Sequence, residues 1–216
     1  AILASVTIPI FQSVRAQSNQ TECAAKLRNL GVSGLMLIQE SGGRMLDAMY
    51  WRVPSEGRAD SVLPYLGFTD GQRDTDAPTA LSCPASFAEI GPNPDWNRSY
   101  SINIYACGSE NGRHDDVAPY NRHYQYLNQV PEVSKMAFFL DGNFLASGAA
   151  ERKVGLASIE RPWNPKTKTG FYHPHPGGSF NVVFLDGHLE TLTLDDIPRG
   201  SAGQEVRMQP FWGSME

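Results

Sequence analysis

The sequence predicts an α+β protein in which a long N-terminal helix packs against a small antiparallel β-sheet with long loops. Apolar side chains recur at helical spacing over the first forty residues. Two apolar segments near the C-terminus flank an Asp-Gly pair, a strong hairpin signal. The 216 residues also include 20 Gly and 15 Pro, more than the roughly 12% of average proteins, which indicates abundant loops. We therefore divide the chain into a helical segment, 1–41, and a β-rich head, 42–216.

The first part of the helical segment is apolar on all sides, and no charged residue precedes Arg15. A membrane-spanning helix needs about 20 apolar residues, so we expect the rest of this apolar segment to lie upstream. A signal peptide would show small residues at a cleavage site after the run, whereas this run continues into a polar helix. We predict that residues 1–14 contact lipid or other helices through Ile2, Leu3, Val6, Ile8, Pro9, Ile10, Phe11 and Val14.

The second part, 15–41, is amphipathic, which predicts a helix with one buried face. A helix from Ile2 to Glu40 is about 58 Å long at 1.5 Å per residue, more than one small domain can cover. Pro9 should kink or locally melt it, and Gly42 and Gly43 should end it. The alternative is a long core helix of a cytosolic protein, but such a helix would have no partner for its apolar start. The expected buried face comprises Cys23, Leu27, Leu30, Gly31, Gly34, Leu35 and Ile38.

The head contains several short strand signals separated by polar loops. Alternating or apolar β-rich residues predict half-buried strands, and Asp186-Gly187 predicts a tight turn between the last two. We expect the sheet to cover the buried face of the helix, with Phe211 and Trp212 anchoring the tail. The segments are an extended stretch at 49–53, a short helix near 60–66, loops at 69–79 and 108–125, and strands at 100–105, 135–140, 180–185 and 189–194.

Charge and cysteine spacing exclude several classes of protein. A net charge of −5 and a sequence pI near 5.5 leave no basic surface for nucleic acid. Cys23, Cys83 and Cys107 show no CxxC pair and no zinc-finger spacing. Cys83 and Cys107 lie in loop-rich surroundings, so the alternatives are a disulfide between them or three free thiols.

Neither a metal site nor an active site follows from local motifs. His173 and His175 would lie on one side of an extended segment, and a metal site with Asp186 and His188 is conceivable. However, the turn alone explains Asp-Gly, and histidines beside proline often bond to loop backbone, so we predict no metal and no cofactor. The chain has no G-x-S-x-G, HExxH or P-loop motif, so we predict no enzymatic activity.

Three segments resemble one protein family. Residues 1–9 resemble the second half of the class III prepilin signature, and 23–31 resemble the C-x-N-N-L-R-Q-L-G segment of type IV pilin-like proteins that carry an H-x9-DG motif in planctomycete and verrucomicrobial lineages. Residues 175–188 are similar to their HGGG-x-N-V-L-F-A-D-G-H ending, and Cys83-Pro84 with Tyr100 and Asn103 resembles their mid-chain segment. The chain departs from the pattern because Asp186 follows His175 by eleven positions rather than ten, and Ala24-Ala25 replaces paired Asn.

The resemblance implies a pilin-like fold with a protruding N-terminal helix. The apolar half of that helix would lie in the inner membrane before assembly and in the core of a surface filament afterwards. It also implies that the partners are other copies of the chain and the assembly machinery of a pilus or secretion system. Physically, an exposed apolar helix must find lipid or neighbouring copies.

Three functions remain open from the sequence. The first is a structural subunit of a type IV pilus-like extracellular filament. The second is a pseudopilin of a type II secretion-like system, which builds a short periplasmic structure. The third is an exported glycan- or metal-binding module that uses the pilin-like helix only as a membrane tether.

Overall fold

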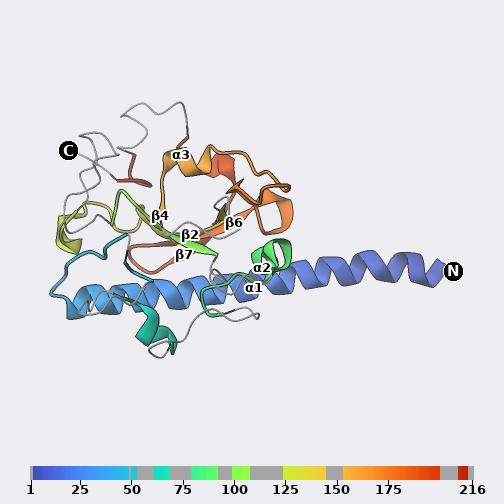
Figure 1. Cartoon of the computed structure of the whole chain (residues 1–216), viewed down its shortest axis with the longest axis horizontal. Helices are drawn as coiled ribbons and strands as arrows, with labels where there is room; N and C mark the ends of the chain where they lie inside the picture. The colour runs from blue at the N-terminus through green and yellow to red at the C-terminus, as the bar shows by residue number, and fades with distance from the viewer. Residues whose placement is uncertain are drawn as a thin grey trace.

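A long helix and a five-stranded sheet dominate the computed structural model, which describes residues 2–48, 50–52, 61–68, 79–91, 99–107, 124–144, 153–199 and 209–213 (Figure 1). This arrangement confirms the α+β class with a long N-terminal helix and a small antiparallel sheet. The elements are α1 (Ile2–Glu40), η1 (Leu63–Leu66), α2 (Pro84–Ile90), β1 (Tyr100–Asn103), η2 (Leu127–Gln129), β2 (Ala137–Asp141), β3 (Asn143–Phe144), β4 (Lys153–Val154), α3 (Leu156–Ile159), β5 (Gly170–Phe171), η3 (Pro176–Gly178), β6 (Phe180–Phe184), β7 (Leu189–Leu192) and η4 (Leu194–Asp196).

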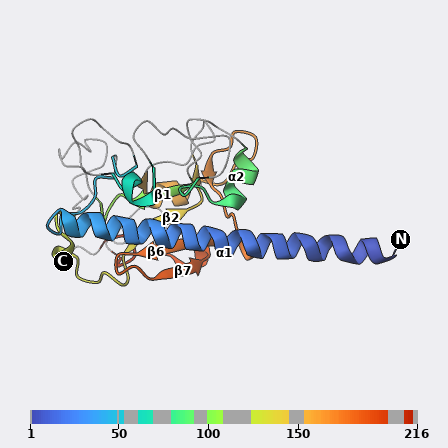
Figure 2. The ribbon, with the colours of Figure 1, turned by 90° about the horizontal axis from the view of Figure 1, so that it is seen from below.

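The helix α1 ends where the sequence predicts but is not interrupted at Pro9. Helical structure continues through Pro9, and Figures 1 and 2 show a nearly straight rod. The predicted kink or melted turn is therefore wrong, because proline removes only one backbone hydrogen bond and the adjacent turns keep the helical path. At the other end Gly42 and Gly43 adopt positive φ angles of 69° and 85°, and the N–H of Gly43 donates to the carbonyl of Ile38 at 2.8 Å, which closes the helix.

The main sheet has the strand order β4-β1-β2-β6-β7. The pairs β1–β2, β2–β6 and β6–β7 are antiparallel, whereas β4 pairs parallel to β1 at the edge. The predicted hairpin is confirmed, since β6 and β7 flank Asp186-Gly187 and Gly187 has a φ of +88°. The strands predicted at 100–105, 135–140, 180–185 and 189–194 correspond to β1, β2, β6 and β7.

Of the other predictions for the head, one is confirmed, one is wrong and two concern residues that the structure hardly describes. The short helix predicted near 60–66 is the 3-10 turn η1. Residues 50–52 form a turn rather than an extended stretch, and the side chains of Trp51 and Arg52 are fully buried there. The predicted loops at 69–79 and 108–125 lie almost entirely outside the described residues.

The helix packs its buried face on one face of the sheet, as Figure 2 shows. The predicted face residues Cys23, Leu27, Leu30 and Ile38 are no more than 1% exposed. Close approach depends on glycine, because a Cβ on Gly34 would lie 2.8 Å from the Phe138 ring. On the sheet side, an irregularity in β2 between 137 and 139 places two consecutive phenylalanines in the same core; they are Phe138 and Phe139.

A second core covers the opposite face of the sheet. Figure 1 shows α3 on this side and α1 on the other. Leu140, Val182 and Phe180 point into this core together with Phe211 and Trp212. The indole N–H of Trp212 also donates to the carbonyl of Pro198 at 2.9 Å, so the predicted anchoring of the tail on the sheet is confirmed.

Candidate functional site

The leading part of α1 extends away from the head into solvent (Figures 1 and 2). Five of its predicted contact residues are exposed: Pro9, together with Ile8 by 59%, Ile10 by 56%, Phe11 by 75% and Val14 by 58%. Ile2, Leu3 and Val6 belong to the same helix, but their side chains lie outside the described residues. No helix in the described part of the chain is both long and apolar enough to count as a membrane span.

Four side chains with metal-binding or nucleophilic atoms meet in the interior, and we call Cys23, Cys83, Asp141 and His175 the four-donor cluster. Their sulfur, oxygen and nitrogen atoms all lie within 4.8 Å of one another, and all four residues are buried. The shortest contacts are 3.0 Å from Cys23 Sγ to Asp141 Oδ2 and 3.0 Å from His175 Nε2 to the same oxygen. Cys83 Sγ lies 3.9 Å from His175 Nε2.

Each donor comes from a different part of the fold. Cys23 belongs to the buried face of α1, and Cys83 is the residue immediately before α2. Asp141 ends β2, and His175 immediately precedes η3. Among the described residues of α1, Cys23 is also the first buried one. The cluster therefore lies where the helix enters the head.

Neighbouring polar groups orient the cluster. The backbone N–H of Asn181 donates to Asp141 Oδ1 at 2.9 Å. The hydroxyl of Tyr100 lies 3.5 Å from Cys23 Sγ as a donor. The other ring nitrogen of His175, Nδ1, is buried without a hydrogen-bond partner among the described residues. All the polar contacts of this ring are thus made through Nε2.

The protonation of the cluster is strongly shifted. Burial acts to raise the pKa of the Cys83 thiol, but hydrogen bonds with Cys23 and His175 outweigh it and lower that pKa to about 6. Burial acts to lower the pKa of His175, but hydrogen bonds with Asp141 and Cys83 outweigh it and raise that pKa to about 9. Burial and the hydrogen bond with Cys83 both raise the pKa of Cys23. Cys83 is therefore the thiol that ionises first.

The cluster does not have the geometry of a catalytic triad. A Cys-His-Asp triad places the cysteine on one ring nitrogen and the carboxylate on the other, whereas Cys83 and Asp141 both approach Nε2 of His175. Neither of the two described cavities is lined by a cluster residue. The arrangement is suited to holding a proton network or a cation.

Of the two alternatives for the cysteines, the structure has the three free thiols and not the Cys83–Cys107 disulfide. Cys83 instead lies in the four-donor cluster, whereas Cys107 is buried elsewhere, and burial with the nearby charge of Asp47 raises its pKa. Sequence separation did not identify the true neighbour of Cys83, since Cys23 reaches it only when α1 packs on the sheet.

The histidines and the acid considered together from the sequence do not form one site. Asp186 and His188 pair with each other at the hairpin, 2.5 Å apart and partly exposed. His173 packs edge-on against Phe171 with ring centroids 5.6 Å apart, and burial lowers its pKa. Only His175 belongs to the four-donor cluster, so the structure does not bring these four residues together.

Sequence reasoning missed three members of the cluster. The separation is 118 residues between Cys23 and Asp141 and 92 between Cys83 and His175, so no short motif connects them. One signal was available: Cys23 lies on the predicted buried face, and Asp141 directly follows an apolar strand. A polar atom expected in the interior requires a partner, but the sequence does not say which.

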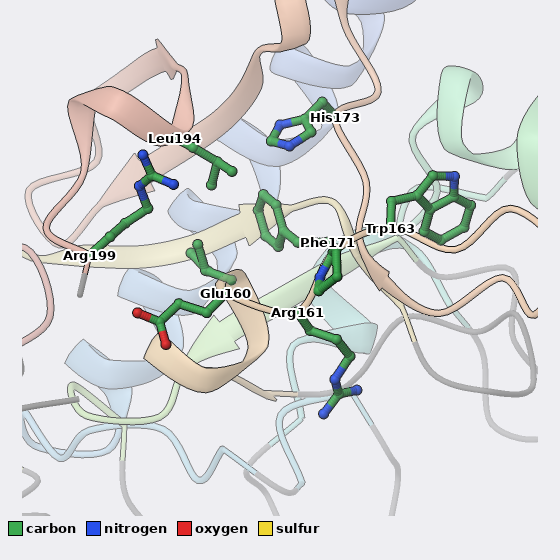
Figure 3. Close-up of a pocket in the computed structure, with 9 residues that line it drawn as sticks. Glu160, Arg161, Trp163, Phe171, His173, Leu194 and Arg199 are labelled. Atoms are coloured by element: carbon green, nitrogen blue, oxygen red, sulfur yellow. The ribbon is translucent and has the colours of Figure 1, made fainter. Parts of the chain in front are cut away.

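A separate cavity of about 630 Å³ lies on the opposite side of the sheet. Figure 3 shows Leu194 and Arg199 on one side, Trp163 on the other and Phe171 between them. Glu160, Arg161 and His173 complete the labelled rim.

Comparison with known proteins adds no relative. No family model, curated protein or solved structure matches this chain.

Proposed function

We propose that this protein is a structural subunit of a pilin-like extracellular filament that polymerises through its N-terminal helix. The observation that carries the proposal is the apolar stretch of α1 that projects beyond the head, with Phe11 exposed by 75% and Val14 by 58%. Burying apolar surface contributes about 25 cal/mol per Å², so contact with lipid or with neighbouring helices stabilises this segment.

The outward face of α1 supports a helical bundle as the core of the filament. Val14 and Val32 are 18 residues apart, or about five turns at 3.6 residues per turn, so they point to the same side. Phe11 and Met36 are 25 residues apart, or about seven turns. Val32 and Met36 are each 46% exposed. Apolar side chains therefore occupy one outward side near both ends of the helix.

This distribution favours staggered copies over a closed dimer. The leading end of one helix can contact the outward side of another at a different height, so the two contacting surfaces differ. A contact of this kind repeats without closing and generates a helical fibre. In the proposal, the unassembled subunit is held in the inner membrane by the same apolar segment, and the assembled filament lies at the cell surface.

The test is assembly of the purified full chain after detergent is diluted, followed by sedimentation and electron microscopy. We expect thin ordered fibres from the unaltered chain and none from Phe11→Ser. The matched control is Tyr126→Ser, which removes another exposed aromatic residue, 42% exposed on the head, and should still assemble. A chain that stays monomeric without detergent would overturn the proposal. In cells, short fibres confined to the envelope would point to a pseudopilin instead.

A further inference from the structure

We infer that the four-donor cluster is a zinc site that fastens α1 to the head. The inference is independent of the proposed filament, since a chain that never polymerises could still bind the ion. It rests on the kinds of donor, on their spacing and on their convergence on one buried carboxylate oxygen of Asp141.

The donor set matches the preferences of zinc. Two thiols, one imidazole and one carboxylate meet here, and tetrahedral zinc is commonly held by Cys, His and Asp ligands. The sulfur donors disfavour magnesium and calcium, which prefer oxygen ligands. Four buried protein donors describe a closed structural site rather than a catalytic one with an open position.

The spacing of the donors is also suitable. Bonds of about 2.0–2.3 Å at tetrahedral angles place donor atoms about 3.3–3.8 Å apart. The contacts in the cluster are 3.0, 3.0 and 3.9 Å, with every pair inside 4.8 Å. Small side-chain movements would therefore bring all four donors to bonding distance from a common centre.

Asp141 Oδ2 is the acceptor that the cluster shares. Cys23 Sγ and His175 Nε2 each lie 3.0 Å from this oxygen, and the Asn181 NH₂ group donates to it at 3.3 Å. Thr191 donates to the amide oxygen of Asn181 at 2.8 Å, which keeps the NH₂ group on the side of the carboxylate. The thiol, the imidazole and the amide therefore converge on one buried carboxylate oxygen, where a cation would replace the protons of the thiol and the imidazole.

A zinc ion would take the place of these protons. The lone pair of Nε2, the carboxylate and both thiolates would all point at the positive charge, because metal ligands bind in their deprotonated forms. The surrounding groups are already placed to support such ligands. The Asn181 backbone N–H donates to Asp141, and the Tyr100 hydroxyl lies 3.3 Å from the carbonyl oxygen of Cys23 and 3.5 Å from its Sγ. Groups of this kind orient metal ligands and adjust their basicity.

The location of the site suggests its role. The cluster joins α1 to the residue before α2, to the end of β2 and to the segment before η3. It lies at the first buried turn behind the projecting part of the helix. Zinc would thus stabilise the attachment of α1 to the head, because binding free energy at a structural site contributes directly to folding.

The experiment measures zinc in the full chain, purified in detergent with a phosphine reductant and zinc present and then desalted. We expect one zinc per chain, and a Co²⁺-substituted sample should show the visible bands of tetrahedral coordination with thiolate charge transfer. Cys83→Ser and His175→Gln should weaken zinc binding in chelator competition by at least about 100-fold, the upper end of the loss caused by removing a supporting residue. Cys107→Ser, another buried cysteine, is the matched control and should retain zinc.

Circular dichroism shows whether each variant is folded. If a variant does not fold, the zinc content of the unaltered chain tests the inference instead. Substoichiometric zinc after purification with the metal would overturn the inference. A Cys23–Cys83 disulfide found by peptide mapping of chain isolated without reductant, together with no zinc uptake after reduction, would also overturn it. So would zinc that survives both ligand substitutions.

Discussion

The two parts of α1 differ in whether their apolar side chains are buried, although they form one continuous helix. From Cys23 onward one face of the helix is buried against the sheet, with Leu27 and Leu30 fully inaccessible. Ahead of it, the apolar side chains described from Ile8 to Val14 are exposed. The buried part is stabilised inside its own molecule, whereas the leading part has surface to bury only against something else. The apolar residues of a helix therefore do not by themselves show whether the surface that buries them belongs to the same molecule or to another one.

The largest difference should appear on truncating one apolar side chain in each part. Leu27→Ala removes a fully buried side chain and should lower the free energy of unfolding by about 2–5 kcal/mol. Phe11→Ala should change it by no more than about 0.5 kcal/mol, because the exposed ring contributes little to the stability of the monomer. Chemical denaturation of detergent-solubilised chain measures both. A Phe11 variant as destabilised as the Leu27 variant would show that the leading segment packs on its own head.

Removing the proposed zinc ion should give the next largest effect. At a free zinc concentration about 100 times its dissociation constant, binding stabilises the folded chain by about 2.7 kcal/mol. A chelator should therefore lower the Tm of the head by about 5–10 °C. Calorimetry with and without chelator measures this shift. The Cys107→Ser variant should shift equally, and the His175→Gln variant should not shift at all.

Filling a close helix–sheet contact should cost somewhat less. Gly34→Ala places a methyl group 2.8 Å from the Phe138 ring, and overpacking of this kind costs about 1–3 kcal/mol. Gln17→Ala, at an exposed position of the same helix, should change stability by less than about 0.5 kcal/mol. Urea midpoints of the two variants provide the measurement. Equal stability for both would mean that α1 does not approach the sheet as closely as the structure shows.

The smallest effect on stability is expected at Pro9. Proline is about 3 kcal/mol less favourable than alanine inside a helix, but here the penalty belongs to a segment outside the head. Because α1 is already helical through Pro9, Pro9→Ala should leave the helix content measured by circular dichroism unchanged, and the unfolding free energy of the head should change by less than about 0.5 kcal/mol. A clear change in head stability would mean that the two parts of the helix unfold together.

Local features of the chain were predicted well because each depends on neighbouring residues. The end of α1 at Gly42 and Gly43 follows from glycine's freedom to adopt positive φ. The β6–β7 hairpin follows from the Asp-Gly turn between two apolar segments. The extended stretch at 49–53 failed because Trp51 and Arg52 are buried in a turn, and tertiary packing outweighs local strand preference there.

The cluster could not be predicted in the same way. Its members are brought together by the packing of α1 on β2 and β6, and no spacing rule links Cys23 to Asp141. The sequence places His175 close to Asp186 and His188, and these residues were considered together as possible metal ligands. In the structure, Asp186 and His188 instead form a separate pair at the hairpin. Closeness in the sequence was a poor guide here, because β6 lies between His175 and the hairpin turn. The turn with Asp186 is therefore at the other end of that strand.

The amino-acid sequence by itself determined the long helix, its apolar and amphipathic halves, and the strands with their turn, since periodicity and turn chemistry act over a few residues. Only the tertiary structure decided which cysteine lies beside His175. It also decided that the leading part of the helix is not buried by any other described part of the molecule. Both depend on contacts between distant segments, whose positions are settled by the packing of the whole core rather than by local preference.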